Sequence, residues 1–474
     1  MSKNSTAQSP IYELDGRPAL RAAVPIGLQH VFAMFIGNLA PILVLSGLVS
    51  NATGMPIITP EQRMLMIQCC MLASGLATVL QLYPIKIRGI QIGAGLPIVM
   101  GTSFGFIPTL SIIGMEYGIN VILGSVIVAS FVEVFMGLYI KHLRKFFSPI
   151  VIGSVLMSIG LYLLPVGVTY FAGGAAAENA YRARQSLLAQ GLEVPAYMAT
   201  LAAQFASWQN LLMGGTVFII IVVLQRFGKG LLKASAIFIA ITVGYVLALI
   251  LGQVNFAAVV NANVVAVPVP FSIRPEFHLG PILAMSIMVV VSGIETLGHV
   301  NGMTVAVWDR QATDKERQGA LLADFAGNVI AASLNTLPNT SFGQNIGIVS
   351  MTKVVNKFCI LIAALVLILA GLSPKAGAVL AAMPPSVLGG AVITVFAMIM
   401  LNGLKMIAKA GFSERNVLIL ALTFGVGYSI ANNTLMVENL PPALRFIFSN
   451  PTIAVCVISM TLHLIFPQKG EDRE

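Results

Sequence analysis

The chain has 474 residues, of which 57% are hydrophobic and only 9% charged, and its net charge is +9. Soluble domains carry about 25% charged residues. The composition therefore excludes a soluble globular protein and predicts an all-α protein that crosses a lipid bilayer many times. The four cysteines lie in apolar stretches without metal-ligand spacing, so we expect no metal site.

Apolar stretches of about 20 residues predict the membrane spans. The polar residues 1–22 precede them and lack the features of a signal peptide, so we interpret them as a cytoplasmic tail. The third and tenth stretches are short. The fourteen predicted spans are 24–49, 64–82, 92–107, 119–140, 148–171, 210–225, 234–254, 280–300, 318–334, 341–352, 356–373, 379–402, 416–432 and 451–466.

The basic residues support this count and orient the spans. Lys and Arg accumulate on the cytoplasmic side of a membrane. With the N-terminus inside, 21 of the 27 Lys and Arg residues fall in cytoplasmic segments. Both termini are therefore expected to be cytoplasmic. The positive charge is spread over many loops, which explains the net charge without a nucleic-acid partner.

The tetrapeptide Thr-Ser-Phe-Gly occurs twice, at 102–105 and 340–343, once in each short span. The two copies are 238 positions apart, about half of the 474 residues, and each follows a Leu-Pro pair. Each half has seven spans. Because seven is odd, the second copy of a seven-span repeat would cross the membrane in the opposite orientation to the first. Inverted repeats with paired broken segments are typical of secondary transporters. The alternative is a chance recurrence of four residues.

The local chemistry of these two segments predicts a break in each span. Proline interrupts a helix, whereas Gly105 and Gly343 allow close backbone approach. We expect a short extended piece followed by a half-helix whose N-terminus presents free N–H groups and positive partial charge. Unwound backbone is tolerated in a membrane only where protein or a cavity surrounds it. A polar ligand is therefore predicted between the segments.

A few ionisable residues lie inside the predicted spans, where they are costly and point to function. Glu295 and His299 share one helix face and suit a proton acceptor and relay, or a buried structural pair. Asp324 could bind a cation or substrate, but we favour a role in holding the tenth span by accepting backbone N–H bonds. His30 either makes a hydrogen bond between two helices or helps to organise the site. Glu133 has no visible partner, and no function is assigned to it.

Amide side chains follow the second Thr-Ser-Phe-Gly copy. Gln344 offers both a donor and an acceptor, which suits the edge of a lactam or a nucleobase. Its alternative role is to cap the half-helix. Capping or interhelical bonding is the expected role of Asn345.

The segment QNIGIVSMTK at 344–353 resembles the signature of the nucleobase–ascorbate transporter family. That signature is Gln or Glu, Asn, any residue, Gly, four residues, Thr and a basic residue. The likeness extends from about residue 16 to 466. It implies fourteen spans in two inverted sevens, broken third and tenth spans, a core domain that moves like an elevator against a gate domain, and a homodimer formed through the gate. The implied boundaries are a tail at 1–22, core at 23–140 and 280–375, gate at 141–279 and 376–467, and a tail at 468–474.

The resemblance also implies roles for individual residues. Glu295 resembles the carboxylate that binds the base, and Gln344 resembles the second side-chain ligand. The remaining substrate contacts implied are Phe104, Ser103, Gly343 and Ser341. The residues implied in proton coupling or the transport cycle are Glu295, His299, Asp324, His30 and Asn345.

The expected function is proton-coupled uptake of xanthine, uric acid or both across a bacterial inner membrane. A glutamine at position 344 is similar to the purine carriers of the family, whereas a histidine at position 299 is similar to its uracil carriers. A pyrimidine symporter is therefore the alternative. An anion carrier or channel of the same architecture would require Arg or Lys at the broken spans. We expect no enzyme activity and no cofactor; the proton is the coupling ion, and sodium stays open.

Overall fold

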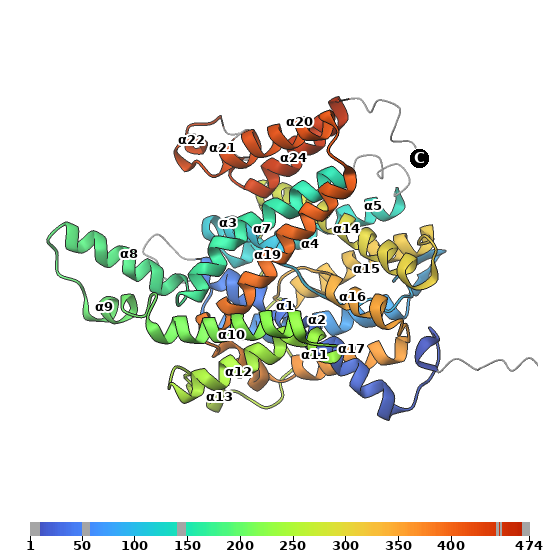
Figure 1. The fold of residues 1–474 in the computed structure, drawn as a ribbon, viewed down its shortest axis with the longest axis horizontal. Helices are drawn as coiled ribbons and strands as arrows, with labels where there is room; N and C mark the ends of the chain where they lie inside the picture. The colour runs from blue at the N-terminus through green and yellow to red at the C-terminus, as the bar shows by residue number, and fades with distance from the viewer. Residues whose placement is uncertain (1–9, 50–56, 140–147, 442–444, 446–447, 467–474) are drawn as a thin grey trace, which may run out of the picture.

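The computed structural model describes residues 10–49, 57–139, 148–441, 445 and 448–466, and most of them are helical (Figure 1). Seven helices in this part of the chain are long and apolar enough to cross a membrane alone. The pair α17 and α18, bent by 85°, would make eight. The prediction of a multi-pass helical membrane protein is confirmed.

The helices differ widely in length. The long apolar ones are α1 (Leu20–Leu48), α2 (Pro60–Leu82), α4 with α5 (Ile119–Ala129, Phe131–Leu138), α7 (Pro149–Phe171), α10 (Trp208–Phe227), α14 (Leu279–Trp308) and α19 (Pro385–Ala410). The others that contribute to the bundle are α3 (Ile107–Tyr117), α12 (Ala236–Ile250), α15 (Asp314–Ser333), α16 (Gly343–Thr352), α17 (Lys357–Gly371), α18 (Pro374–Ala381), α20 (Glu414–Leu422) and α24 (Pro451–Ile465).

Short helices occupy the connections. They are α8 (Ala175–Ala189), α9 (Ala196–Ala202), α11 (Leu231–Ala234), α13 (Ala257–Asn261), α21 (Ser429–Ala431) and α22 (Thr434–Glu438), and a π-helical stretch (Thr423–Tyr428) joins α20 to α21. Helices α8 and α9 project from one side of the molecule (Figure 1). Hydropathy did not predict them because α8 is rich in polar residues.

Two small sheets interrupt the helices. Strands β1 (Ile85–Ile87) and β2 (Ile90–Ile92) form an exposed hairpin. Strands β3 (Met100–Thr102) and β4 (Asn339–Ser341) are fully buried and pair antiparallel, with Met100 opposite Ser341. Each Thr-Ser-Phe-Gly segment thus lies at the end of a short extended piece, as predicted: Thr102 ends β3, and Thr340 and Ser341 end β4.

The third predicted span was placed too early in the chain. Its expected range, 92–107, holds the end of β2, a loop, β3 and a 3-10 turn at Phe104–Phe106, and the helix follows only at α3. Pro108 suits the first turn of α3, where its missing N–H is not needed. Gly118, with φ +86°, ends that helix. The tenth range, 341–352, matches α16 closely.

Close helix contacts depend on small residues, as is common in membranes. Helices α7 and α19 lie side by side through the middle of the molecule (Figure 1). A Cβ atom added at Gly403 would lie 2.4 Å from the backbone nitrogen of Met157, and one at Gly160 would lie 2.5 Å from that of Met400. These two helices therefore form one tightly packed unit.

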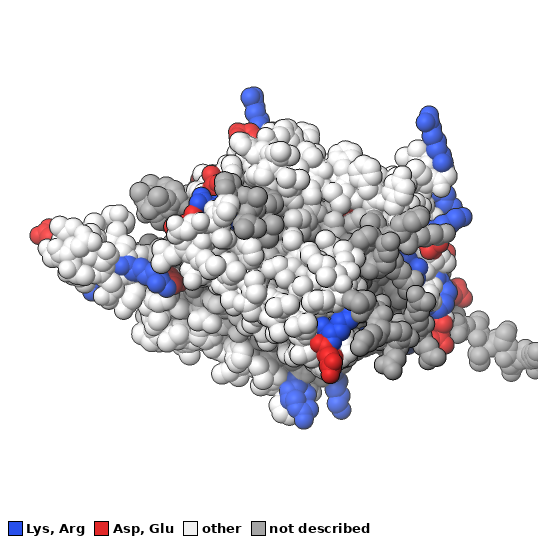
Figure 2. All heavy atoms as spheres, turned by 90° about the horizontal axis from the view of Figure 1, so that it is seen from above, with Lys and Arg blue, Asp and Glu red and all other residues white. Residues whose placement is uncertain are grey.

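Charged side chains are sparse on the surface seen in Figure 2, and most of them lie near its outline. The broad uncharged area between them suits contact with lipid.

Candidate functional site

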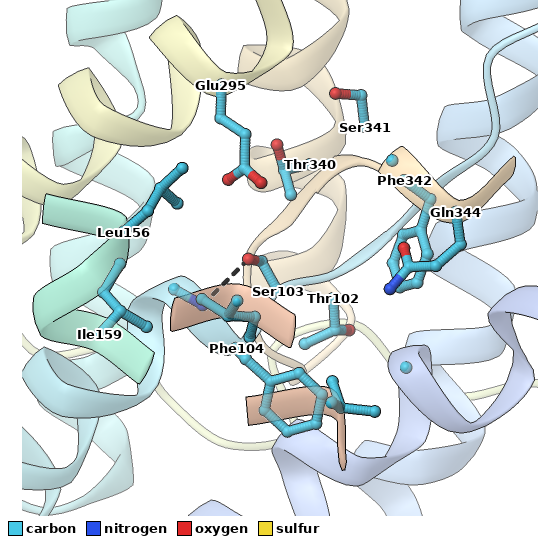
Figure 3. A pocket seen from close by; sticks show the side chains of 15 residues that line it. Thr102, Ser103, Phe104, Leu156, Ile159, Glu295, Thr340, Ser341, Phe342 and Gln344 are labelled. Carbon is cyan, nitrogen blue, oxygen red and sulfur yellow. Dashed lines mark hydrogen bonds between the residues drawn. The ribbon is translucent and has the colours of Figure 1, made fainter. Parts of the chain in front are cut away.

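A pocket lies where β3 and β4 meet, between the first turns that follow them (Figure 3). The empty space there is about 520 Å³ when the open solvent at its mouth is counted, so the enclosed part is smaller. All six residues predicted to contact substrate line it. The lining residues are Gly37, Thr102, Ser103, Phe104, Gly105, Leu156, Ile159, Glu295, Thr340, Ser341, Phe342, Gly343, Gln344, Val395 and Ile399.

The two chain turns at this pocket differ, because only the turn that begins α16 presents unpaired backbone N–H groups. Helix α16 begins at Gly343, and no side chain caps it. Its first N–H groups therefore have no partner within the helix and give this end positive partial charge. On the opposite side, the Ser103 hydroxyl accepts a 3.0 Å hydrogen bond from the Gly105 N–H (Figure 3).

Glu295 and His299 lie on one face of α14, as their spacing predicted. The Glu295 Oε1 atom is 3.9 Å from His299 Nε2, and His299 Nδ1 is 2.9 Å from the Ser341 hydroxyl. The Glu295 side chain is 29% exposed and points into the pocket (Figure 3). A Cβ atom at Gly343 would lie 2.8 Å from His299 Nε2. His299 thus connects the carboxylate to the segment that carries β4 and α16.

The Gln344 amide faces the pocket from the first turn of α16 (Figure 3). Among the described residues, it takes part in no side-chain hydrogen bond, so its donor and acceptor are both available. The Gln344 side chain does not cap α16, because the N-cap of this helix has no side-chain hydrogen bond.

Asp324 is fully buried behind β4 and does not line the pocket. The Thr296 hydroxyl donates to its Oδ2 atom and also lies 3.0 Å from the Ser341 hydroxyl. The expectation that Asp324 accepts backbone N–H bonds was wrong. Asn328, one turn later on α15, takes that role and accepts from the Asn339 N–H at 2.7 Å. Asp324 therefore supports β4 through the hydroxyl group of Thr296.

Replacing Thr296 with valine is expected to raise the KM for substrate about tenfold, because it leaves the buried Asp324 without its only described donor. Thr296→Ser keeps the hydroxyl and serves as the control. Uptake by reconstituted protein measures both. Equal KM values for Thr296→Val and the wild type would show that this contact does not position the site.

His30 and Asn345 lie behind the pocket, fully buried between α1 and α16. The Asn345 Nδ2 atom lies 3.1 Å from His30 Nδ1 and donates to the His30 carbonyl at 3.0 Å. This is the interhelical bond considered for both residues, and it fixes α16 against α1. Their part in the transport cycle stays a prediction.

The two phenylalanines of the repeated tetrapeptide are both 6% exposed and have different neighbours. The Phe104 ring meets Phe396 of α19 edge to face, with ring centroids 5.0 Å apart. The Phe342 ring fills the space beside Gly37 and Gly101, where added Cβ atoms would lie 2.7 and 2.5 Å from it. Sequence reasoning selected Phe104 and missed Phe342, although the tetrapeptide itself pointed to both.

An apolar wall closes the pocket on one side. Leu156 and Ile159 come from α7, and Val395 and Ile399 come from α19 (Figure 3). Sequence reasoning missed them because apolar residues in an apolar helix carry no distinguishing signal. No Lys or Arg lines the pocket. The described residues contain no group of three or more His, Cys, Asp or Glu arranged to hold a metal ion.

Solved structures with the same fold are transporters. The chain aligns with the transmembrane domain of the cyanobacterial bicarbonate transporter BicA at 14% identity, with a TM-score of 0.57 over 94% of this chain and 96% of that one. It aligns with the murine Slc26a9 anion transporter at 12% identity and a TM-score of 0.63 over 98% of this chain and 73% of that one. At these identities the likeness shows the fold alone.

Sequence relatives are more specific. The xanthine permease of Bacillus subtilis is 31% identical, with 93% of each chain covered. The uric acid permease PucJ of the same organism is 32% identical over 93% of this chain and 92% of that protein. The profile of the permease family matches residues 21–435. The chain therefore belongs to this permease family, the nucleobase–ascorbate transporters, and is a membrane transport protein rather than an enzyme.

Proposed function

We propose that this protein carries a purine base, xanthine or uric acid, across the bacterial inner membrane together with a proton. The pocket between the two paired broken segments carries this proposal. It combines an acidic acceptor, an uncommitted amide and free backbone N–H groups on one small cavity. The names of the relatives indicate the same substrates.

The chemistry of an oxidised purine fits these groups. Its ring edges alternate N–H donors with carbonyl acceptors. Glu295 would accept from ring N–H groups, and Gln344 would pair with an adjacent donor and acceptor. The N–H groups at Gly343 would bind ring carbonyls. The apolar wall and Phe104 would contact the flat face of the base.

We further propose fourteen spans in two inverted sevens, with both termini cytoplasmic. The core would comprise 23–140 and 280–375, and the gate would comprise 141–279 and 376–467. The pocket supports this division, because Glu295 and Gln344 come from the proposed core, whereas Leu156 and Val395 come from the proposed gate. Elevator movement of the core would then carry the base across, and the gates of two copies would form a homodimer.

Proton coupling would use the Glu295–His299 pair. A proton on Glu295 or His299 changes the charge beside the pocket and the bond to Ser341, so proton binding and substrate binding are linked. Uptake should therefore rise as the external pH falls.

The test is uptake of radiolabelled xanthine by purified protein in liposomes, at two external pH values, with and without sodium. Unlabelled uric acid, hypoxanthine, guanine and uracil serve as competitors. We expect saturable uptake, stronger at acidic pH, that uric acid inhibits. Uracil uptake without purine competition would establish the pyrimidine alternative, which His299 brings into consideration. A steady anion current without competition by bases would establish an anion carrier, although the negative Glu295 and the absence of Lys or Arg from the pocket lining disfavour it.

A further inference from the structure

A tyrosine near the end of α7 joins the proposed gate to the proposed core. The Tyr170 hydroxyl lies 2.8 Å from the Leu43 carbonyl of α1 and 3.0 Å from the Val44 carbonyl, and it donates its proton to this pair. Tyr170 is buried and lies outside the lining of the substrate pocket. This hydrogen bond crosses the boundary between the two proposed domains, and the proposed transport function gives it no role.

Helix α1 has space for this hydroxyl because residue 47 is a glycine. A Cβ atom added at Gly47 would lie 2.0 Å from the Tyr170 hydroxyl oxygen and 3.0 Å from the ring carbon that carries it. Gly47 lies in the last turn of α1, one turn after Leu43. A side chain at position 47 would therefore displace the hydroxyl, so Gly47 and Tyr170 form one matched contact.

A second tyrosine of α7 makes a similar contact with α3. The Tyr162 hydroxyl lies 3.1 Å from the Ser111 hydroxyl. Leu156 of α7 lines the substrate pocket, and Tyr162 and Tyr170 follow it toward the end of that helix. The proposed topology places this end of α7 on the outer side of the membrane.

Helix α24 adds a third contact on the same side. The Asn450 side chain, at the N-cap of α24, donates to the Thr109 hydroxyl of α3 at 2.9 Å. Near the other end of α24, His463 Nδ1 lies 3.3 Å from the hydroxyl of Ser148, the N-cap of α7. The two helices are therefore antiparallel, and Asn450 lies toward the Tyr170 end of α7.

On the cytoplasmic side of the pocket, the proposed domains meet through apolar side chains. They come from the start of α7, from the middle of α14 and from α24. A small cavity there is lined by Val151, Ile152, Val155, Val291, Ile294 and Cys456. Such contacts can exchange neighbours without the loss of a strong hydrogen bond. The hydrogen bonds described above thus close the outer side of the boundary in this structure.

The Tyr170 contact can open at low cost. The Leu43 and Val44 carbonyls lie within α1, where backbone N–H groups also donate to them. Gly47 and Tyr170 line a cavity whose empty space is about 810 Å³ when open solvent is counted. Water can therefore replace each partner when α1 and α7 separate. The net effect is that of one hydrogen bond, which changes an equilibrium about twofold to tenfold.

We propose that Tyr170 and Gly47 form an outer latch, a hydrogen bond that holds the core against the gate while the outer side is closed. This bond breaks before the substrate pocket opens to the outside. Tyr170 is a positioning residue, because it acts through α1 and does not line the pocket. The contacts of Tyr162 and Asn450 support the same closed arrangement. The inference rests on the proposed division into core and gate.

Tyr170→Phe tests the latch, because it removes the hydroxyl and keeps the ring. The reporter is Leu156→Cys, a thiol in the pocket wall, in a chain whose four native cysteines are buried. A membrane-impermeant maleimide labels this thiol from outside in intact cells, or from the cytoplasmic side in inside-out vesicles. We expect Tyr170→Phe to raise the rate from outside about fivefold and not to raise the rate from the cytoplasmic side.

Tyr245→Phe is the matched control. The Tyr245 hydroxyl donates to the Val379 carbonyl at 2.8 Å, and both residues lie in the proposed gate. Its labelling rates should equal those of the protein that carries Leu156→Cys alone. Gly47→Ala displaces the hydroxyl from the side of α1 and should act like Tyr170→Phe. It decides the matter alone if Tyr170→Phe does not fold, as judged by thermal unfolding.

Three results would overturn the inference. They are unchanged labelling from outside in a folded latch variant, an equal rise in Tyr245→Phe, and a rise from the cytoplasmic side instead. Labelling requires no substrate, so it can be read whatever the protein carries. Failure of the wild type to carry xanthine would instead overturn the proposed function.

Discussion

Glu295→Gln is expected to abolish concentrative xanthine uptake and to weaken binding about hundredfold. Glutamine cannot take up a proton, and its amide places a donor where the base also presents a donor. Loss of a charge-assisted hydrogen bond together with an unpaired buried donor accounts for an effect of about 3 kcal/mol. The pocket offers no other acidic side chain that could replace it.

Two measurements separate coupling from binding in this variant. Accumulation against a gradient requires the proton, whereas exchange of labelled for unlabelled xanthine requires only the binding site. We expect both to be lost, because Glu295 would serve both. Glu116→Gln, in an exposed position at the far end of α3, is the matched control and should transport normally. Uphill accumulation by Glu295→Gln would contradict the assignment.

Gly101→Ala is expected to have the second largest effect, on both folding and transport. The added Cβ atom would lie 2.5 Å from the Phe342 ring and 2.9 Å from the Asn38 side-chain oxygen. The ring cannot retreat toward α1, because it already lies against Gly37. Overpacking of this kind costs about 1–3 kcal/mol, and here it would push β3 away from β4.

The readouts are the thermal unfolding temperature of the purified protein and the KM for xanthine. We expect a lower unfolding temperature and a raised KM. Gly347→Ala is the matched control, since a Cβ atom at Gly347 of α16 would meet nothing within 4 Å. If the two glycine variants behave alike, the contact between Phe342 and Gly101 does not hold the site together.

Much of the site was predictable because its chemistry is rare in a membrane. An acidic residue in an apolar span attracts attention by its cost, and the spacing of Glu295 and His299 placed them on one helix face. The repeated tetrapeptide predicted two extended segments that face each other, and β3 and β4 pair in that way. These inferences depended on local sequence and on symmetry between the two halves.

Contacts between distant, ordinary residues were not predictable. Thr296 is an unremarkable residue in α14, and only the fold brings it to Asp324. Glu133 had no visible partner because Asn328, whose side chain donates to it, is 195 positions away. The third span was misplaced because its apolar stretch contains a strand and a turn before the helix begins, which hydropathy cannot distinguish.

The pairing of β3 with β4 limits where this site can open. Each strand satisfies part of its backbone hydrogen bonding through the other, and the residues of both strands are buried. Separating the strands would leave backbone N–H and C=O groups without hydrogen-bond partners, and each unsatisfied group costs several kcal/mol of free energy. The apolar side chains of Leu156 and Val395 have no hydrogen bonds to lose, so a movement past them exchanges one set of dispersion contacts for another. In the proposed elevator movement, β3 and β4 would therefore move together without separating, and the base would be released along the apolar wall.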